Sequence, residues 1–308
     1  MHPWLLPLFL LLSSSCVAPL VQDAGLAGPD VLEPGTAAQL VEVRAGDGVT
    51  LRGAFLDAGP GAPVVLHLLP SGASTRTGVP AGIGRIGLSG TLETLRAHGW
   101  SSLVLDYRGV GRSDGERDAG QLSVDGRAMW DEALRRAGGA PSRVVVRATS
   151  IGTLVAAGLL ATGSAPSGRH TSDAPGAAVL VTPVRAPSVV MNAARERGGT
   201  LAAWWARMVH TTPAMPDLTT VVASGRIPLL LVLAADDPYL PAREAEQLHA
   251  TATGAGHRVE VLKGSHARTV LRAWGFDLDE EGFAGRRVTG LMDAERQFLD
   301  NLELTPTQ

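Results

Sequence analysis

The sequence predicts an α/β fold, a mostly parallel central sheet with helices on both faces. Short runs of aliphatic and β-branched residues recur along the chain, and segments with helical spacing of apolar residues lie between them. Each run is almost continuously apolar, as expected for strands buried on both faces of a parallel sheet. Alternation of strand and helix indicates the α/β class. The length of 308 residues suits one large domain with a small lid.

The expected elements follow one another at short intervals. A β-hairpin is expected over residues 40–44 and 49–55, because a polar turn with two glycines separates two apolar runs. Further strands are expected at residues 62–67, 102–106, 143–146, 177–181, 227–233 and 258–262. Helices are expected at residues 92–98, 123–136, 153–160, 242–250 and 286–302. Residues 184–226, a mixed stretch with three prolines, are expected to form the lid insert.

The composition excludes several classes of function. A hydrophobic content of 45% and a net charge of −3 describe an ordinary globular protein and argue against a nucleic-acid partner. With a single cysteine, Cys16, the chain can form no intramolecular disulfide. The histidines are scattered without metal-ligand spacing, so we expect no metal and no organic cofactor.

The N-terminus carries a second pattern. Residues 4–12 form an apolar run of nine residues, too short to span a bilayer, which needs about 20 in a helix. Small residues and Cys16 follow, which is typical of a secretory signal. The arrangement resembles a bacterial lipoprotein signal, which implies lipid attachment at Cys16 and anchoring in the cell envelope. The alternative is a plain signal cleaved after Ala18. The expected organisation is therefore a signal at 1–16, a flexible tether at 17–37 and the folded domain at 38–303.

The strongest functional pattern surrounds Ser150. An apolar strand precedes it, and a helix of small apolar residues follows it. A nucleophile elbow requires this context, because the turn must expose the serine oxygen and the next amide must face the reacting carbonyl. The stretch is Ala148-Thr149-Ser150-Ile151-Gly152, with alanine in place of the first glycine of G-x-S-x-G. The alternative role for Ser150 is a helix N-cap.

A second serine matches G-x-S-x-G literally. Ser113 stands in Gly111-Arg112-Ser113-Asp114-Gly115, after the strand that ends at Asp106. The residues that follow it are polar and include another glycine, which indicates a loop without a helix N-terminus. We therefore expect Ser150, not Ser113, to be the nucleophile.

A serine nucleophile needs a base, and the base needs a carboxylate that holds its tautomer. His266 is the histidine expected in a loop directly after a strand, at the edge of the sheet where Ser150 lies. Two adjacent acids, Asp236 and Asp237, follow the strand before it. Asp237 is the preferred partner and Asp236 the alternative, and either could instead cap the following turn.

The order Ser150, Asp237, His266 is that of the α/β-hydrolase superfamily. The stretch Asp106-Tyr107-Arg108-Gly109-Val110-Gly111-Arg112-Ser113-Asp114-Gly115 resembles the loop after strand four of its serine hydrolases. Similarly, Asp237-Pro238-Tyr239-Leu240-Pro241 resembles their acid turn. The resemblance covers about residues 38–303 and is strongest to the capless or small-lid esterases, lipases and peptidases.

The resemblance implies a Ser150–His266–Asp237 triad and an oxyanion hole made by the amides of Ile151 and Leu69. In relatives, His-Gly ends the third strand; here His67 is followed by Leu68. The implied activity is hydrolysis of an ester or related acyl bond in a small molecule. The alternatives are a serine peptidase, or an envelope-anchored binding protein with little or no activity. In the insert, Met191, Leu201, Trp204, Trp205, Met208 and Val209 are expected to line the substrate pocket or to pack on the sheet.

Overall fold

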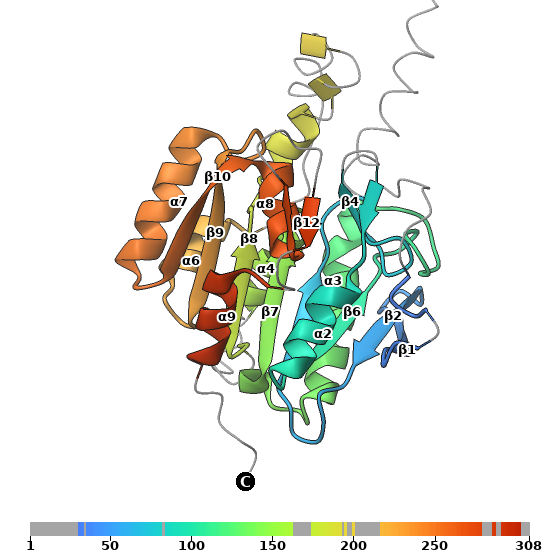
Figure 1. Cartoon of the computed structure of the whole chain (residues 1–308). Coiled ribbons are helices and arrows are strands. Elements are labelled where there is room, and N and C mark those ends of the chain that lie inside the picture. The colour runs from blue at the N-terminus through green and yellow to red at the C-terminus, as the bar shows by residue number, and fades with distance from the viewer. Residues whose placement is uncertain are drawn as a thin grey trace, which may run out of the picture.

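The computed structural model contains an eight-stranded sheet at its centre (Figure 1). It describes residues 30–33, 35–81, 84–162, 174–192, 194–195, 199–200, 216–278, 285–287 and 291–302. The strand order is β1-β2-β6-β3-β7-β8-β9-β10. The strands are β1 (Gln39–Arg44), β2 (Thr50–Leu56), β3 (Val64–Leu68), β6 (Ser101–Leu105), β7 (Val144–Thr149), β8 (Ala177–Val181), β9 (Leu229–Asp236) and β10 (Arg258–Ser265). Two pairings in this sheet are antiparallel, β1 with β2 and β2 with β6, and the other five are parallel, so the predicted, mostly parallel α/β architecture is confirmed.

Helices cover both faces of the sheet. They are α2 (Ser89–Ala97), α3 (Leu122–Arg136), α4 (Gly152–Thr162), α6 (Leu218–Ala223), α7 (Ala242–Gly254), α8 (His266–Ala273) and α9 (Asp293–Asp300). The connection from β3 through α2 to β6 moves along the sheet towards β1. The connections through α3, α4, α6 and α7 move towards β10 instead. Because crossovers are right-handed, the two directions place their helices on opposite faces. Figure 1 shows α2 and α9 together on the near face.

Two small hairpins lie outside the sheet, β4 (Val79–Ala81) with β5 (Gly84–Ile86) and β11 (Phe276–Leu278) with β12 (Gly285–Arg287). The second one corrects the sequence prediction. The helix expected over 286–302 is wrong in its first part, since residues 285–287 form a strand and α9 begins at Asp293. Val288, Thr289 and Gly290 are poor helix formers, whereas Asp293 and Glu295 favour a helix start through the helix dipole.

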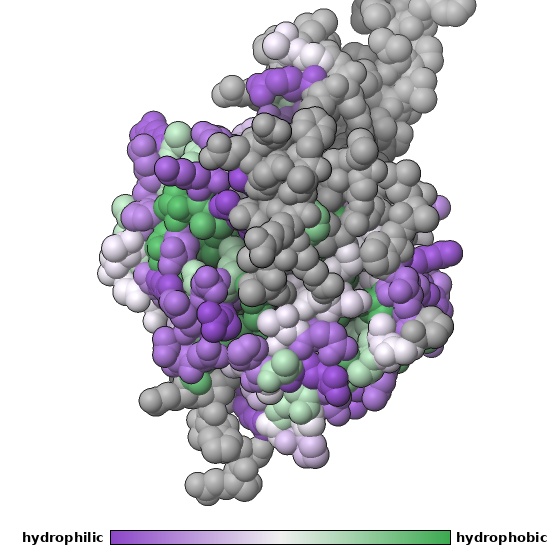
Figure 2. Space-filling view, in the orientation of Figure 1, coloured by the Kyte–Doolittle hydropathy of each residue, from purple (hydrophilic) through white to green (hydrophobic). Residues whose placement is uncertain are grey.

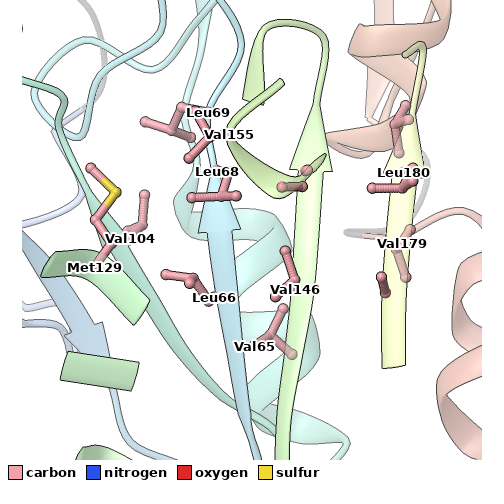
Figure 3. Close-up of a cluster of buried hydrophobic side chains, with 14 of the residues drawn as sticks. Val65, Leu66, Leu68, Leu69, Val104, Met129, Val146, Val155, Val179 and Leu180 are labelled. Atoms are coloured by element: carbon pink, nitrogen blue, oxygen red, sulfur yellow. The ribbon is translucent and has the colours of Figure 1, made fainter. Parts of the chain in front are cut away.

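The core is continuous through the middle strands. Residues of β3, β7 and β8 are buried, as the almost continuous apolar runs predict. Figure 3 shows these side chains packing with Met129 of α3 and Val155 of α4. The labelled members are Val65, Leu66, Leu68, Leu69, Val104, Met129, Val146, Val155, Val179 and Leu180. This packing fixes the carboxyl end of β7, where Ser150 follows.

The strand β10 forms one edge of the sheet. Figure 2 shows apolar surface beside α7, where this strand lies, and Val261 is 54% exposed. Charged residues at positions 258, 260 and 263 interrupt the apolar residues along the strand. Charges on an edge strand discourage pairing with another chain.

The N-terminal end of the described chain is packed. Val31 is buried, and its amide donates to the carbonyl oxygen of Thr75 at 2.9 Å. Asp30 forms an ion pair with Arg112. Within the stretch 17–37 predicted as a tether, Asp30 and Val31 thus contact the folded domain, and residues 17–29 lie outside the described chain.

Much of the predicted lid insert, 184–226, also lies outside the described residues. Residues 186–192 are helical and α6 occupies the end of the insert. Met191 packs against the core. Leu201, Trp204, Trp205, Met208 and Val209 lie outside the described residues.

A close contact between α3 and α4 yields a stability prediction. A Cβ on Gly126 would lie 2.2 Å from Cγ1 of Val155, whereas a Cβ on Gly158 would meet nothing within 4 Å. We expect Gly126→Ala to lower the free energy of unfolding by about 1–3 kcal/mol, because overpacking outweighs the gain in helix propensity. Gly158→Ala, the matched control, should raise it by up to about 1 kcal/mol. Urea unfolding at 25 °C measures both, and equal stability of Gly126→Ala and the wild type would contradict the packing argument.

Candidate active site

Ser150 lies in a strained turn between β7 and α4. Its φ angle is +54°, in the left-handed region that residues with a Cβ seldom adopt. The turn is held because the Ser150 amide donates to the carbonyl oxygen of Val181 at 2.9 Å. The hydroxyl of Thr153 donates to the carbonyl oxygen of Ser150 at 2.6 Å. Two neighbouring hydrogen bonds thus maintain the unfavourable backbone angle that turns the Ser150 side chain out of the strand.

The glycine of this turn has a specific steric reason. A Cβ on Gly152 would lie 2.3 Å from the carbonyl oxygen of Leu68, so the backbones of α4 and β3 touch there. Ala148, in contrast, is a fully buried residue inside β7 that pairs in register with Leu68. The close approach requires glycine at position 152, and the methyl group of Ala148 fits in the sheet.

His266, directly after the carboxyl end of β10, lies within hydrogen-bond distance of Ser150. Its Nε2 lies 2.8 Å from Oγ of Ser150. We expected it in a loop, but β10 extends to Ser265 and His266 is the first residue of α8. Ser265 caps this helix, since its Oγ accepts the amide of Arg268 at 3.4 Å. The histidine therefore starts a rigid element instead of lying in a loop.

Asp237 completes the chain of hydrogen bonds. Its Oδ2 lies 2.7 Å from Nδ1 of His266, and its Oδ1 accepts the amide of Tyr239 at 2.8 Å. A carboxylate at Nδ1 places the proton on that nitrogen, so Nε2 is free to accept the hydroxyl proton of Ser150. The Tyr239 ring packs edge-on against His266 with 4.8 Å between ring centres. Asp236, the alternative acid, is exposed.

Ser113 has a structural role. Its hydroxyl donates to the carbonyl oxygen of Asp106 at 2.6 Å and accepts the amide of Arg52 at 2.9 Å. These bonds tie the loop after β6 to β2. The Ser113 hydroxyl is therefore engaged in hydrogen bonds with backbone groups, as expected for a serine with a structural role in a loop.

The same loop holds a buried carboxyl group. Burial raises the pKa of Asp106 to about 6, against hydrogen bonds from the amide and hydroxyl of Thr75 and the amide of Arg112. Gly111 must be glycine, because a Cβ there would lie 2.2 Å from Oδ2 of Asp106. Asp106 thereby connects the loop after β3 with the loop after β6, at the carboxyl ends of these strands.

The two residues predicted for the oxyanion hole lie on the elements that meet at the turn. Ile151 follows Ser150 directly, and Leu69 follows the Leu68 carbonyl that touches Gly152. Both side chains are buried. The hydroxyl of Tyr107 lies 3.5 Å from the carbonyl oxygen of Leu69. Ile151 and Leu69 each stand one residue from a member of the close contact between Gly152 and Leu68.

A buried cluster beneath the site was not predicted. Arg147 of β7 pairs with Glu295 of α9, and its guanidinium carbon lies 4.5 Å from the ring centre of Trp274. His67 packs beside the same ring, with 5.6 Å between centres. Burial, with the nearby charge of Arg147, lowers the pKa of His67, which keeps that imidazole neutral. An arginine inside an aliphatic strand was the available sequence signal, but its partner lies 148 residues away.

A cavity of about 480 Å³ opens beside the acid turn. Its apolar wall includes Leu154, one helical turn after Ser150, and Leu240, three residues after Asp237. Arg185, Asp217 and Glu244 contribute charge to its lining, and Arg185 pairs with Glu244 at 3.2 Å. This volume is in the range of small-molecule sites.

Metal binding and membrane crossing can be judged for the described part of the chain. There, no group of three or more His, Cys, Asp or Glu side chains is arranged to hold a metal ion. No helix within the same residues has the length and apolar character that crossing a bilayer requires. Cys16 lies outside this part of the chain.

The sheet order, the turn at Ser150 and the placement of His266 and Asp237 define the α/β-hydrolase fold, and solved structures share it. The Pyrococcus furiosus esterase Pf2001 superposes with a TM-score of 0.57 at 17% identity, over 82% of this chain and 91% of that one. An alpha-beta hydrolase from Vibrio vulnificus gives 0.56 at 19% identity, over 89% and 91%. Dipeptidyl peptidase 4 from Porphyromonas gingivalis gives 0.52 at 14% identity, over 75% of this chain and 32% of that one. No protein-family model and no curated protein matches the sequence.

Proposed function

We propose that this protein is a serine hydrolase that cleaves an ester or related acyl bond of a small molecule. The observation that carries the proposal is the unbroken path from Ser150 Oγ through His266 to Asp237, with distances of 2.8 and 2.7 Å. A nucleophile, its base and the group that orients the base lie within hydrogen-bond reach, which is the arrangement that acyl transfer requires.

Each step of the proposed reaction uses one of these contacts. Ser150 Oγ attacks the carbonyl carbon while its proton passes to Nε2 of His266. Asp237 keeps His266 in the required tautomer and stabilises the imidazolium. As the tetrahedral intermediate collapses, the bond to the leaving alcohol breaks and His266 donates the proton to that oxygen. Water then attacks the acyl-enzyme, with His266 as base, and releases the acid and free Ser150.

The amides of Ile151 and Leu69 are proposed to bind the oxyanion. Leu68 replaces the family's usual glycine, but the contact of its carbonyl oxygen with Gly152 keeps the adjoining backbone beside Ser150. Fixed donors at this position act where the negative charge develops, and one donor contributes about 10²–10³ to turnover in comparable sites.

The geometry of Ser150 favours a hydrolase over a binding protein, and the likeness to an esterase supports ester chemistry. Pf2001, which shares the fold, is an esterase. A binding protein without activity has no need for a left-handed serine aligned with a histidine and an aspartate, because the turn costs free energy. A serine peptidase would use the same triad, and the dipeptidyl peptidase shares the fold. Turnover of nitrophenyl esters against aminoacyl anilides separates the two.

The choice of nucleophile is tested by covalent labelling. We expect a fluorophosphonate probe to label the wild type and Ser113→Ala, and not Ser150→Ala, because only Ser150 has an adjacent base. Gel fluorescence measures the labelling, and circular dichroism checks that each variant is folded. Absence of labelling in the wild type, or its loss in a folded Ser113→Ala variant, would overturn the assignment.

The adjacent aspartates provide a matched pair. Asp237→Asn should lower kcat by about 10²–10⁴-fold, because an amide at this position no longer fixes the imidazole tautomer. Asp236→Asn should stay within about threefold of the wild type, since Asp236 is exposed. Steady-state hydrolysis of a nitrophenyl ester measures both variants. Similar losses in the two variants would contradict the role of Asp237.

We also propose that the protein is exported and anchored in the bacterial envelope through a lipid on Cys16. The short apolar run before this lone cysteine supports the proposal. Mass spectrometry of the membrane-extracted protein should find a lipid-modified chain that begins at Cys16, and Cys16→Ser should release the protein from the membrane. An unmodified chain that begins after Ala18 would contradict this.

A further inference from the structure

Arg147 makes a set of contacts that the proposed chemistry does not use directly. It lies in β7, three residues before Ser150, and is 1% exposed. Its Nε and Nη2 donate to the two carboxylate oxygens of Glu295, and Nη2 also donates to the carbonyl oxygen of Ala273. The face of its guanidinium packs on Trp274. One side chain therefore bonds β7 to α9 and to the end of α8.

The bond to Ala273 leads to the proposed base. Ala273 is the last residue of α8, and His266 is the first. An α-helix of eight residues is a rigid rod of about 12 Å, so its position at one end sets its position at the other. The strand that carries Ser150 therefore also holds the helix that carries His266.

Stability alone does not account for Arg147. Its neighbours in β7 include Val144, Val145 and Val146, and the strand is buried throughout. Replacing a buried ion pair by apolar side chains of similar volume is often neutral or stabilising. Moreover, Nη1 of Arg147 has no hydrogen-bond partner among the described residues, which adds to the cost of burying the guanidinium.

We propose that Arg147 is a positioning residue, which sets His266 against Ser150 by holding the carboxyl end of α8, with Glu295 as its counter-charge. The inference rests on the proposed hydrolase function. The guanidinium suits this task because its planar donors can bind the carboxylate and the carbonyl oxygen together. Lysine offers a single charged centre and cannot reproduce both contacts.

The test compares two double variants. Arg147→Met/Glu295→Leu removes the contacts of Arg147 with Glu295 and Ala273 without leaving a buried charge. Arg108→Met/Asp125→Leu is the matched control, since Arg108 and Asp125 form another buried pair, at 2.7 Å, and among the described residues neither bonds to α8. We expect the first variant to lower kcat for a nitrophenyl ester by about 10–100-fold with KM within about threefold, because a misplacement near 1 Å can cost about 10²-fold. The control should keep kcat within about threefold once corrected for the folded fraction.

A second readout works without turnover. The proton on Nδ1 of His266 gives a downfield NMR resonance, which should move in Arg147→Met/Glu295→Leu and stay in the control. Wild-type kcat with an unmoved resonance in that folded variant overturns the inference. A wild type that neither hydrolyses esters nor reacts with a fluorophosphonate overturns the proposed function instead. In that case the His266 resonance alone shows whether Arg147 positions His266. Should the double variant fail to fold, Arg147→Lys, which keeps the charge, decides by the same two readouts.

Discussion

The structure depends on one close crossing, where the turn after β7 meets the end of β3. The turn can form only because residue 152 lacks a side chain, and it is held although Ser150 adopts a left-handed angle. The neighbouring elements serve this crossing. The backbone of β8 anchors Ser150, Thr153 closes the turn from within α4, and the missing side chain of Gly126 lets α3 support that helix. The packing of β3, β8, α3 and α4 around the turn thus determines the position of the Ser150 hydroxyl oxygen.

Three carboxyl groups near the carboxyl ends of the parallel strands, those of Asp237, Asp106 and Glu295, have different environments. Asp237 lies next to an imidazole and a backbone amide, which suits a carboxylate. Asp106 accepts three hydrogen bonds in a buried position, and burial nevertheless raises its pKa to about 6. Glu295 has the guanidinium of Arg147 as its partner. The same functional group serves three tasks because solvation and partners differ.

Local sequence was sufficient to predict the fold class and the three side chains that the structure brings within hydrogen-bond distance of one another. Apolar runs predict buried strands, and polar residues directly after them mark the active edge, which is how Ser150, Asp237 and His266 were found. The same patterns set Ser113 aside despite its better match to the motif. What could not be predicted depends on distant partners. The bond between Arg147 and Glu295, the start of α8 at His266 and the packing of Val31 on Thr75 arise only when remote segments meet.

The distance in sequence between Arg147 and Glu295 bears on how the protein is made. Ser150, β3 and β7 are synthesised early, whereas His266, the end of α8 and Glu295 follow more than 100 residues after Ser150. A nascent chain therefore carries Ser150 before His266 and before the contacts of Arg147 with Ala273 and Glu295 can form. Under the proposed mechanism, such an unfinished chain cannot activate Ser150, so the order of synthesis itself delays the reaction until the later segment has folded.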